Sequence, residues 1–294
     1  MKTPIFTGSA VALVTPFNEN GVDYEKLAEI VEYHIENKTD AIVVCGTTGE
    51  PSTMPDEEHT AVMKFVIEKV AKRIPVIAGA GSNDTEHAIY LSKFAQDAGA
   101  DGLLHVAPYY NKTTQKGLCA HIKAIAESVD IPIILYNIPG RTGGLGFSID
   151  TLKELSKLPN INGIKEATGD LAFVGRIAEE TDLNIYAGND DIIVPVLSVG
   201  GKGVISVIAN IMPKETHDIC EKYLNGDTEG SRKDFLKVLK LVRTLFIEVN
   251  PIPIKTAMNL MGFNMGKLRM PLCDMTEENL QTLKSVLTEY GLLK

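Results

Sequence analysis

The stretches IPIILYNIPGRTGG (residues 131–144) and GIKEATG (residues 163–169) each pass from aliphatic residues into a cluster of polar residues and glycine. An apolar run that does not alternate with polar residues predicts a strand covered on both faces, as in a parallel sheet. The segment between the two runs is long enough for one helix. The chain here therefore predicts strand, helix and strand, with chemically capable side chains where each strand ends.

This pattern repeats along the chain and predicts eight strands. We expect them near Ser9–Val14, Ala41–Cys45, Val76–Gly79, Gly102–Val106, Ile133–Tyr136, Gly163–Lys165, Ile185–Ala187 and Val204–Val207. Eight strands that alternate with helices predict an α/β fold, specifically a (β/α)8 TIM barrel. An open doubly wound sheet is the alternative. It is disfavoured because the first strand ends in Val-Thr-Pro-Phe (residues 14–17) without a glycine-rich phosphate-binding turn.

The alternation stops after Gly226, and three helical stretches follow, near Asp227–Glu248, Ile254–Met261 and Thr276–Tyr290. We therefore expect a catalytic barrel domain over residues 1–226 and a C-terminal helical domain, a small appendage, over residues 227–294.

Composition excludes several classes of function. The 294 residues carry a net charge of −9, which argues against nucleic acid and against an anionic membrane surface as partners. No apolar run approaches the roughly 18 residues of a membrane span, and the N-terminus does not resemble a signal peptide. The four cysteines, at positions 45, 119, 220 and 273, are too dispersed for a metal motif and predict reduced thiols in the cytoplasm.

Barrel enzymes place their chemistry at the carboxyl ends of the strands, and Lys165 is the sharpest candidate there. Partial burial lowers the pKa of a lysine, and the free amine attacks a carbonyl to form a Schiff base. The alternative is a lysine that reaches solvent or pairs with Glu166. Tyr136 ends the preceding strand, so its phenol could move the protons that imine formation requires, or simply fill the barrel.

Groups that could bind carboxylates follow the second and the fifth predicted strands. Thr47 and Thr48 lie in a glycine-flanked turn whose hydroxyls and N–H groups could hold a carboxylate, although ordinary turn chemistry explains them equally well. Arg141 lies on a glycine-flanked loop and suits a second carboxylate, or solvent. Asp190 and Asp191 would repel a phosphate, so we expect an unphosphorylated substrate. The dispersed histidines lack the spacing of a zinc site, and we expect neither a metal nor an organic cofactor.

These motifs resemble the dihydrodipicolinate synthase family of pyruvate-dependent Schiff-base aldolases, within the N-acetylneuraminate lyase superfamily. The resemblance runs nearly end to end. It includes GTTGE (residues 46–50), YNIPGRTG (136–143), GIKEATG (163–169), NPIP (250–253) and LRMPL (268–272). It implies a lyase that condenses pyruvate with L-aspartate 4-semialdehyde to 4-hydroxy-tetrahydrodipicolinate, on the route to diaminopimelate and lysine, without a cofactor.

The resemblance also implies residue roles. Lys165 would form the imine with pyruvate, Tyr136 would donate and accept protons, and Thr47 with Tyr110 would complete a proton relay. Thr48 would hold the pyruvate carboxylate and Arg141 the carboxylate of the semialdehyde. The backbone carbonyl of Ile205 would lie near the lysine. Tyr110 would enter the site of a neighbouring subunit in a homo-oligomer, expected to be a dimer of dimers.

Two departures from the family pattern bear on regulation and loop geometry. Lysine-inhibited relatives carry Ser, His and Glu where this chain has Pro51, Asp56 and His87, although His59, Asn83 and Tyr109 remain. The missing Glu would pair with the amine of lysine, so we expect weak or absent feedback inhibition. The stretch 143–148 is also richer in glycine, which leaves the loop around Arg141 undefined.

Two other functions fit the same motifs less well. N-acetylneuraminate lyases and 2-keto-3-deoxy sugar-acid aldolases use the same lysine and tyrosine, but they commonly have Ser where Thr47 stands. A non-catalytic barrel that senses pyruvate or an amino acid is the remote alternative, because folds host many functions. The presence of both Lys165 and Tyr136 argues against it.

Overall fold

A computed structural model describes residues 2–293 and contains the predicted barrel. Eight parallel strands close on themselves in the order β1-β10-β9-β8-β7-β6-β5-β4. Their bounds are β1 (Gly8–Ala12), β4 (Ala41–Val44), β5 (Val76–Gly79), β6 (Gly102–Val106), β7 (Ile133–Asn137), β8 (Ile161–Glu166), β9 (Asn184–Ala187) and β10 (Gly203–Ser206). Each predicted strand is confirmed to within two residues at either end.

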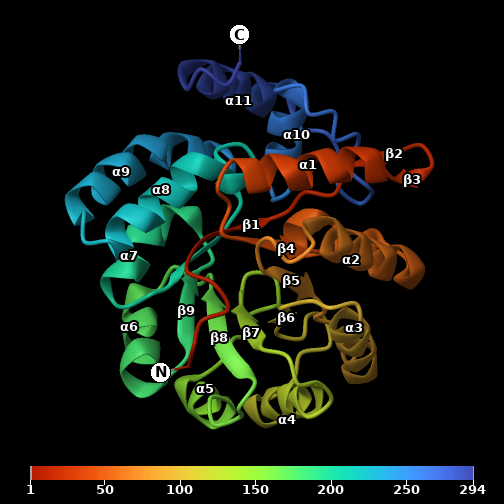
Figure 1. Cartoon of the computed structure of the whole chain (residues 1–294), viewed down its shortest axis with the longest axis vertical. Coiled ribbons are helices and arrows are strands. Elements are labelled where there is room, and N and C mark those ends of the chain that lie inside the picture. The colour runs from red at the N-terminus through yellow and green to blue at the C-terminus, as the bar shows by residue number, and fades with distance from the viewer. Residues whose placement is uncertain (1, 294) are drawn as a thin grey trace.

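The helices form a ring around the strands (Figure 1). Within that ring the chain runs through α1 (Tyr24–Glu36), α2 (Asp56–Val70), α3 (Thr85–Asp97), α4 (Gln115–Ala126), α5 (Ile149–Leu155), α6 (Leu171–Glu180), α7 (Ile193–Ser198) and α8 (Pro213–Leu224). Asp23 and Asp84 are N-caps, since their side chains accept hydrogen bonds from the backbone N–H groups of Lys26 and His87. Such a cap stabilises a helix by about 1 kcal/mol.

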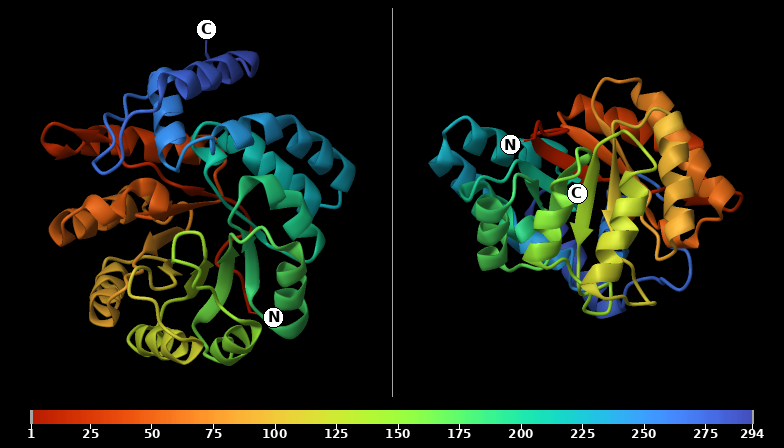
Figure 2. Two further views of the ribbon diagram at one scale, coloured as in Figure 1. Left: turned by 180° about the vertical axis from the view of Figure 1, so that it is seen from behind. Right: turned by 90° about the horizontal axis from the view of Figure 1, so that it is seen from below.

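Three helices follow the barrel: α9 (Thr228–Thr244), α10 (Ile252–Leu260) and α11 (Glu277–Glu289). They confirm the three predicted helical stretches. The C-terminal pair, α10 and α11, lies outside the ring next to α1 (Figures 1 and 2). Buried side chains of all three helices belong to the same apolar cluster as the outer faces of the barrel strands. The C-terminal segment is therefore packed on the barrel.

A hairpin that the sequence did not predict, β2 (Phe17–Asn18) with β3 (Gly21–Val22), follows the first barrel strand. Short 3₁₀ turns also follow three strands near the carboxyl end of the barrel. They are η1 (Thr47–Gly49) with η2 (Pro51–Thr53), η3 (Asp190–Ile192) and η4 (Ile208–Asn210).

Side chains on alternate positions of the strands fill the barrel. This inner cluster contains Ala10, Val43, Ile77, Ile134 and Ile205, among others. At the amino end, the ring of Phe6 stacks on Tyr186 with 4.4 Å between ring centroids. The Tyr186 hydroxyl also donates to the carbonyl of Phe6 over 2.9 Å. The barrel floor is thus closed by protein, and the carboxyl end is left for chemistry.

Candidate active site

Lys165 and Tyr136 lie side by side inside the barrel. They are register partners on the neighbouring parallel strands β8 and β7, so both side chains point to the same face. Each is only 6% exposed. The Nζ atom of Lys165 lies 4.4 Å from the centroid of the Tyr136 ring. The predicted pairing of amine and phenol is therefore present in the structure.

The surroundings of Lys165 favour a reactive amine. Burial lowers the pKa of Lys165 to about 8; the charge of Asp190 opposes this shift and the charge of Arg141 adds to it. A group with this pKa is about one-tenth free amine at pH 7, far more than an exposed lysine. Glu166, the alternative partner considered from the sequence, points to the other face of β8. It accepts hydrogen bonds from the Asn137 side chain over 2.6 Å and from the backbone N–H of Thr168 over 2.7 Å.

The Tyr136 phenol is held in its protonated form. Burial raises the pKa of Tyr136 to about 12, although the charge of Arg141 and a hydrogen bond with Thr47 oppose this shift. A protonated phenol beside an amine can donate a proton to a departing oxygen and recover it later. The hydrogen bond brings Thr47 into this group, in which the family resemblance also places it.

The turn η1 carries Thr47 and Thr48 and is fixed from several sides. The hydroxyl of Thr15, just after β1, donates to the carbonyl of Gly49 over 2.8 Å. The side-chain amide of Asn250 donates to the Thr48 hydroxyl oxygen over 3.1 Å. Because that oxygen accepts from Asn250, the Thr48 hydrogen remains available to donate to a carboxylate.

Arg141 lies on the loop that follows β7. Its guanidinium donates to the backbone carbonyl of Asn250 over 2.8 Å, and its charge acts on both Lys165 and Tyr136. The structure defines the glycine-rich loop left undefined by the sequence. Residues 143–144 are two glycines with positive φ, and the N–H of Phe147 donates to the side chain of Asn137 over 3.1 Å. The loop thus returns to the end of β7 with Arg141 at the site.

A cavity of about 470 Å³ opens at this end of the barrel. Thr47, Tyr136 and Arg141 line its inner part. Asp56 of α2 and His87 of α3 line it as well, which shows that the cavity extends outward between these two helices. The cavity therefore opens Thr47, Tyr136 and Arg141 to solvent, while Lys165 lies next to Tyr136, outside the cavity lining.

The structure places the two remaining predicted residues very differently. Ile205 of β10 is fully buried in the barrel and is the register partner of Ala10. Tyr110 is 92% exposed and has a positive φ of 65°, while its neighbour Tyr109 lines the cavity. Within residues 2–293 of one chain, Tyr110 is the predicted site residue that stands apart from the others.

Asp190 has a role that the sequence interpretation missed. We expected it to face a ligand and repel phosphate. Instead it is buried, and its Oδ2 accepts hydrogen bonds from the backbone N–H groups of Val207 and Ile208 over 3.0 and 2.9 Å. It holds the ends of β9 and β10 together and supplies a negative charge that acts on Lys165. The sequence signal that could have revealed this role is the position of Asp190 shortly after a buried strand.

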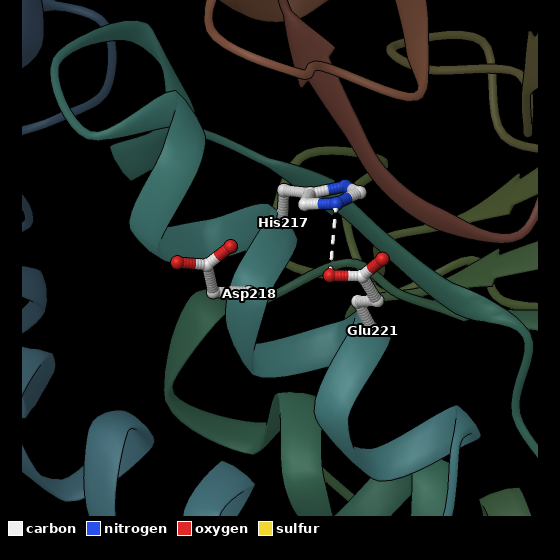
Figure 3. A group of neighbouring side chains, drawn as sticks. All are labelled: His217, Asp218 and Glu221. Atoms are coloured by element: carbon white, nitrogen blue, oxygen red, sulfur yellow. Dashed lines mark ion pairs between the residues drawn. The ribbon is translucent and has the colours of Figure 1, made fainter.

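Among the described residues, one group of side chains has the spacing of a metal site: His217, Asp218 and Glu221 on α8. Figure 3 shows His217 facing Glu221, one helical turn away. The other ring nitrogen of His217 lies 2.9 Å from the carboxylate of Asp40, and Asp218 pairs with Lys214. Asp40 also accepts from the N–H of Ser9 near the start of β1, so this cluster lies at the amino end of the barrel. It cannot assist Lys165.

Comparisons with known proteins agree with this geometry. The model of the dihydrodipicolinate synthetase family matches residues 5–290. The 4-hydroxy-tetrahydrodipicolinate synthase of Caldicellulosiruptor saccharolyticus is 63% identical over 291 residues, which cover 98% of each chain. The dihydrodipicolinate synthase structure from Aquifex aeolicus has a TM-score of 0.96 and 45% identity, and covers 98% of this chain and 99% of its own. That from Cyanidioschyzon merolae with lysine bound has a TM-score of 0.95 and 40% identity, over 99% and 100%.

Proposed function

The chain belongs to the dihydrodipicolinate synthetase family, and on that premise we propose that Lys165 is the amine with which it captures pyruvate. The protein is an enzyme of the class I aldolase type. It condenses pyruvate with L-aspartate 4-semialdehyde to 4-hydroxy-tetrahydrodipicolinate, in the biosynthesis of diaminopimelate and lysine. The observation that carries the assignment of Lys165 is its buried amine, 4.4 Å from the Tyr136 ring.

The proposed reaction begins when the free amine of Lys165 attacks the keto carbon of pyruvate. Tyr136 donates a proton to the departing oxygen, water leaves, and a protonated imine remains. The imine withdraws electrons, so the pyruvate methyl group loses a proton to the Tyr136 phenolate and an enamine forms. The enamine carbon attacks the aldehyde of the second substrate, and the aldehyde oxygen takes that proton from Tyr136 to become a hydroxyl. The amine of that substrate then closes the ring and expels Lys165. These steps use only groups of the chain and its substrates.

The other residues bind the substrate carboxylates or pass protons. Thr47, hydrogen-bonded to Tyr136, passes protons between that phenol and Tyr110. Thr48 donates its free hydroxyl hydrogen to the pyruvate carboxylate. Arg141, held by the carbonyl of Asn250, attracts the carboxylate of the semialdehyde. Ile205 offers its backbone carbonyl from β10, which is separated from β8 by β9.

We also propose a homo-oligomer, a dimer of dimers, in which Tyr110 enters the site of the neighbouring subunit. Its 92% exposure in the single chain supports this role, because a hydroxyl that faces solvent cannot relay protons within a closed site. We place the enzyme in the cytoplasm. All four cysteines are free thiols, three of them buried, which is typical of a reducing compartment. No helix in the described part of the chain is long and apolar enough to cross a membrane.

A substrate panel tests the activity. Purified enzyme is incubated with pyruvate and L-aspartate 4-semialdehyde, or with N-acetylmannosamine or a sugar-derived aldehyde in place of the semialdehyde. Mass spectrometry identifies the product in each case. We expect 4-hydroxy-tetrahydrodipicolinate from the first pair and little product from the others. Turnover of a sugar aldehyde without turnover of the semialdehyde would overturn the assignment in favour of a sugar-acid aldolase.

A further inference from the structure

A buried ion pair joins the turn after β4 to the C-terminal helix α10. The Nζ atom of Lys255 on α10 lies 2.8 Å from Oε1 of Glu50, and their side chains are 1% and 0% exposed. The second carboxylate oxygen of Glu50 accepts a hydrogen bond from the backbone N–H of Arg269 over 2.9 Å. Burying two charges costs several kcal/mol each, and apolar residues in their place are often equally stabilising. The pair therefore calls for a role other than stability.

Glu50 stands directly after the turn that carries Thr47 and Thr48. Its N–H donates to the carbonyl of Thr47, and its φ of 58° and ψ of 38° place it in the left-handed region, which costs a non-glycine residue energy. A residue in this conformation persists only where its surroundings hold it. The ion pair with Lys255 supplies such a restraint.

Three residues of the C-terminal segment contact this one turn. Asn250 donates to the Thr48 hydroxyl, Lys255 pairs with the Glu50 carboxylate, and Arg269 donates its N–H to the same carboxylate. The cation of Lys255 also lies 4.2 Å from the centroid of the ring of Phe17, a residue of β2 in the β2–β3 hairpin. The turn is thus fixed by residues about 200 positions later in the chain.

We propose that the Glu50–Lys255 ion pair is a positioning device for the reaction. It holds the turn so that Thr47 stays hydrogen-bonded to Tyr136 and Thr48 stays directed at the pyruvate carboxylate. Neither Glu50 nor Lys255 touches substrate. Both act through the two threonines, and the proposal rests on the function assigned above.

The chain offers a matched control. The guanidinium of Arg269 pairs with Glu58 on α2, with one contact of 2.7 Å. This pair joins the same C-terminal segment to the same part of the barrel, but it is partly exposed, and Glu58 itself makes no contact with Thr47, Thr48 or Glu50. Arg269 reaches Glu50 through its backbone N–H and Glu58 through its guanidinium, so Glu58→Gln removes the second link and leaves the Glu50–Lys255 ion pair in place.

The experiment compares Glu50→Gln, Lys255→Met, the double variant and the control Glu58→Gln with the wild type. For each we measure the melting temperature, kcat, KM for pyruvate, and the pyruvate concentration that half-saturates borohydride labelling of Lys165. We expect both single variants to be less stable, because each leaves a buried charge unpaired. Their KM and half-saturating concentration for pyruvate should rise about 10- to 100-fold, because the threonines are misplaced. Glu58→Gln should stay within about twofold of the wild type.

The double variant separates positioning from stability. It removes both charges, so its melting temperature should recover while its KM for pyruvate stays high. Recovery of both quantities would show that the pair is only structural and would overturn the proposal. A double variant that does not fold would overturn it as well, because the pair would then be needed for stability. Wild-type values for pyruvate in the folded single variants would also overturn it. A wild type that pyruvate and borohydride do not label would instead contradict the assignment of Lys165, which keeps the two failures distinct.

Discussion

The reactivity proposed for Lys165 depends on its place on a strand. Residues on β8 alternate between the barrel interior and the helix layer, and Lys165 falls on the interior face beside Tyr136. There, burial lowers the pKa of its amine to about 8. The same lysine one position earlier or later would point away from the phenol.

This pKa predicts a pH dependence. Only the unprotonated amine attacks pyruvate, and the lowered pKa means that this form grows as the pH rises toward 8 and dominates above it. The rate of pyruvate-dependent labelling of Lys165 by borohydride, measured from about pH 6 to pH 10, should rise nearly tenfold per unit and level off above about pH 8. Arg141→Gln should move the midpoint to higher pH, because it removes a positive charge that lowers this pKa. A flat profile would show that Lys165 does not titrate in the step.

Removal of one hydroxyl tests the proton donor. Tyr136→Phe keeps the ring that fills the barrel, so the melting temperature should change little. Turnover should fall about 10²- to 10⁴-fold, the usual contribution of a positioned acid–base group. Steady-state kinetics measure the loss, and Thr47→Val should cause a smaller one. A Tyr136→Phe enzyme with more than half of the wild-type rate would exclude the phenol from the mechanism.

Among the elements, the strands could be predicted because a strand that is buried on both faces has a continuous run of apolar residues in the sequence. The catalytic candidates were predictable for a related reason, since the carboxyl ends of parallel strands meet at one face. The hairpin β2–β3 was not, because strands of two residues leave no periodic pattern. Asp190 was misjudged because its partners, two N–H groups 17 and 18 residues later, leave no local trace in the sequence.

The prediction about feedback inhibition by lysine concerns residues on helices α2 and α3. The structure places Nε2 of His87 3.0 Å from the carboxylate of Asp56, across the outer part of the cavity. The carboxylate of Asp56 thus already has a partner, and no glutamate stands at position 87 to bind the amine of lysine. We expect enzyme rates with and without about 1 mM lysine to agree within error. His87→Glu should introduce some sensitivity. A fall in wild-type activity at micromolar lysine would refute the prediction.

At the scale of the whole molecule, the structure ties distant parts of the chain together. The sequence indicated a barrel over residues 1–226 and a helical domain over 227–294, and this division stays a prediction. The contacts of Asn250 and Lys255 with the threonine turn could not be predicted, because they join residues more than 200 positions apart. From the sequence we expected the C-terminal segment to be an appendage, whereas in the structure it contacts the turn that carries Thr47 and Thr48.

The role proposed for Tyr110 in a neighbouring subunit predicts how mixed assemblies behave. Tyr110→Phe and Lys165→Ala should each be nearly inactive alone. Co-expressed in equal amounts, they should form mixed assemblies in which a site with an intact Lys165 meets an intact Tyr110 from its neighbour. Random pairing would then restore about a quarter of the wild-type activity. Assays of the co-purified mixture measure this recovery. If mixed assemblies form but activity does not return, Tyr110 does not act across an interface.

Borohydride reduction in the presence of pyruvate, followed by peptide mass mapping, tests the role of Lys165 most directly. We expect a single reduced pyruvate adduct, found on the peptide that contains Lys165 and absent when pyruvate is omitted. No adduct, or an adduct on a peptide without Lys165, would contradict it.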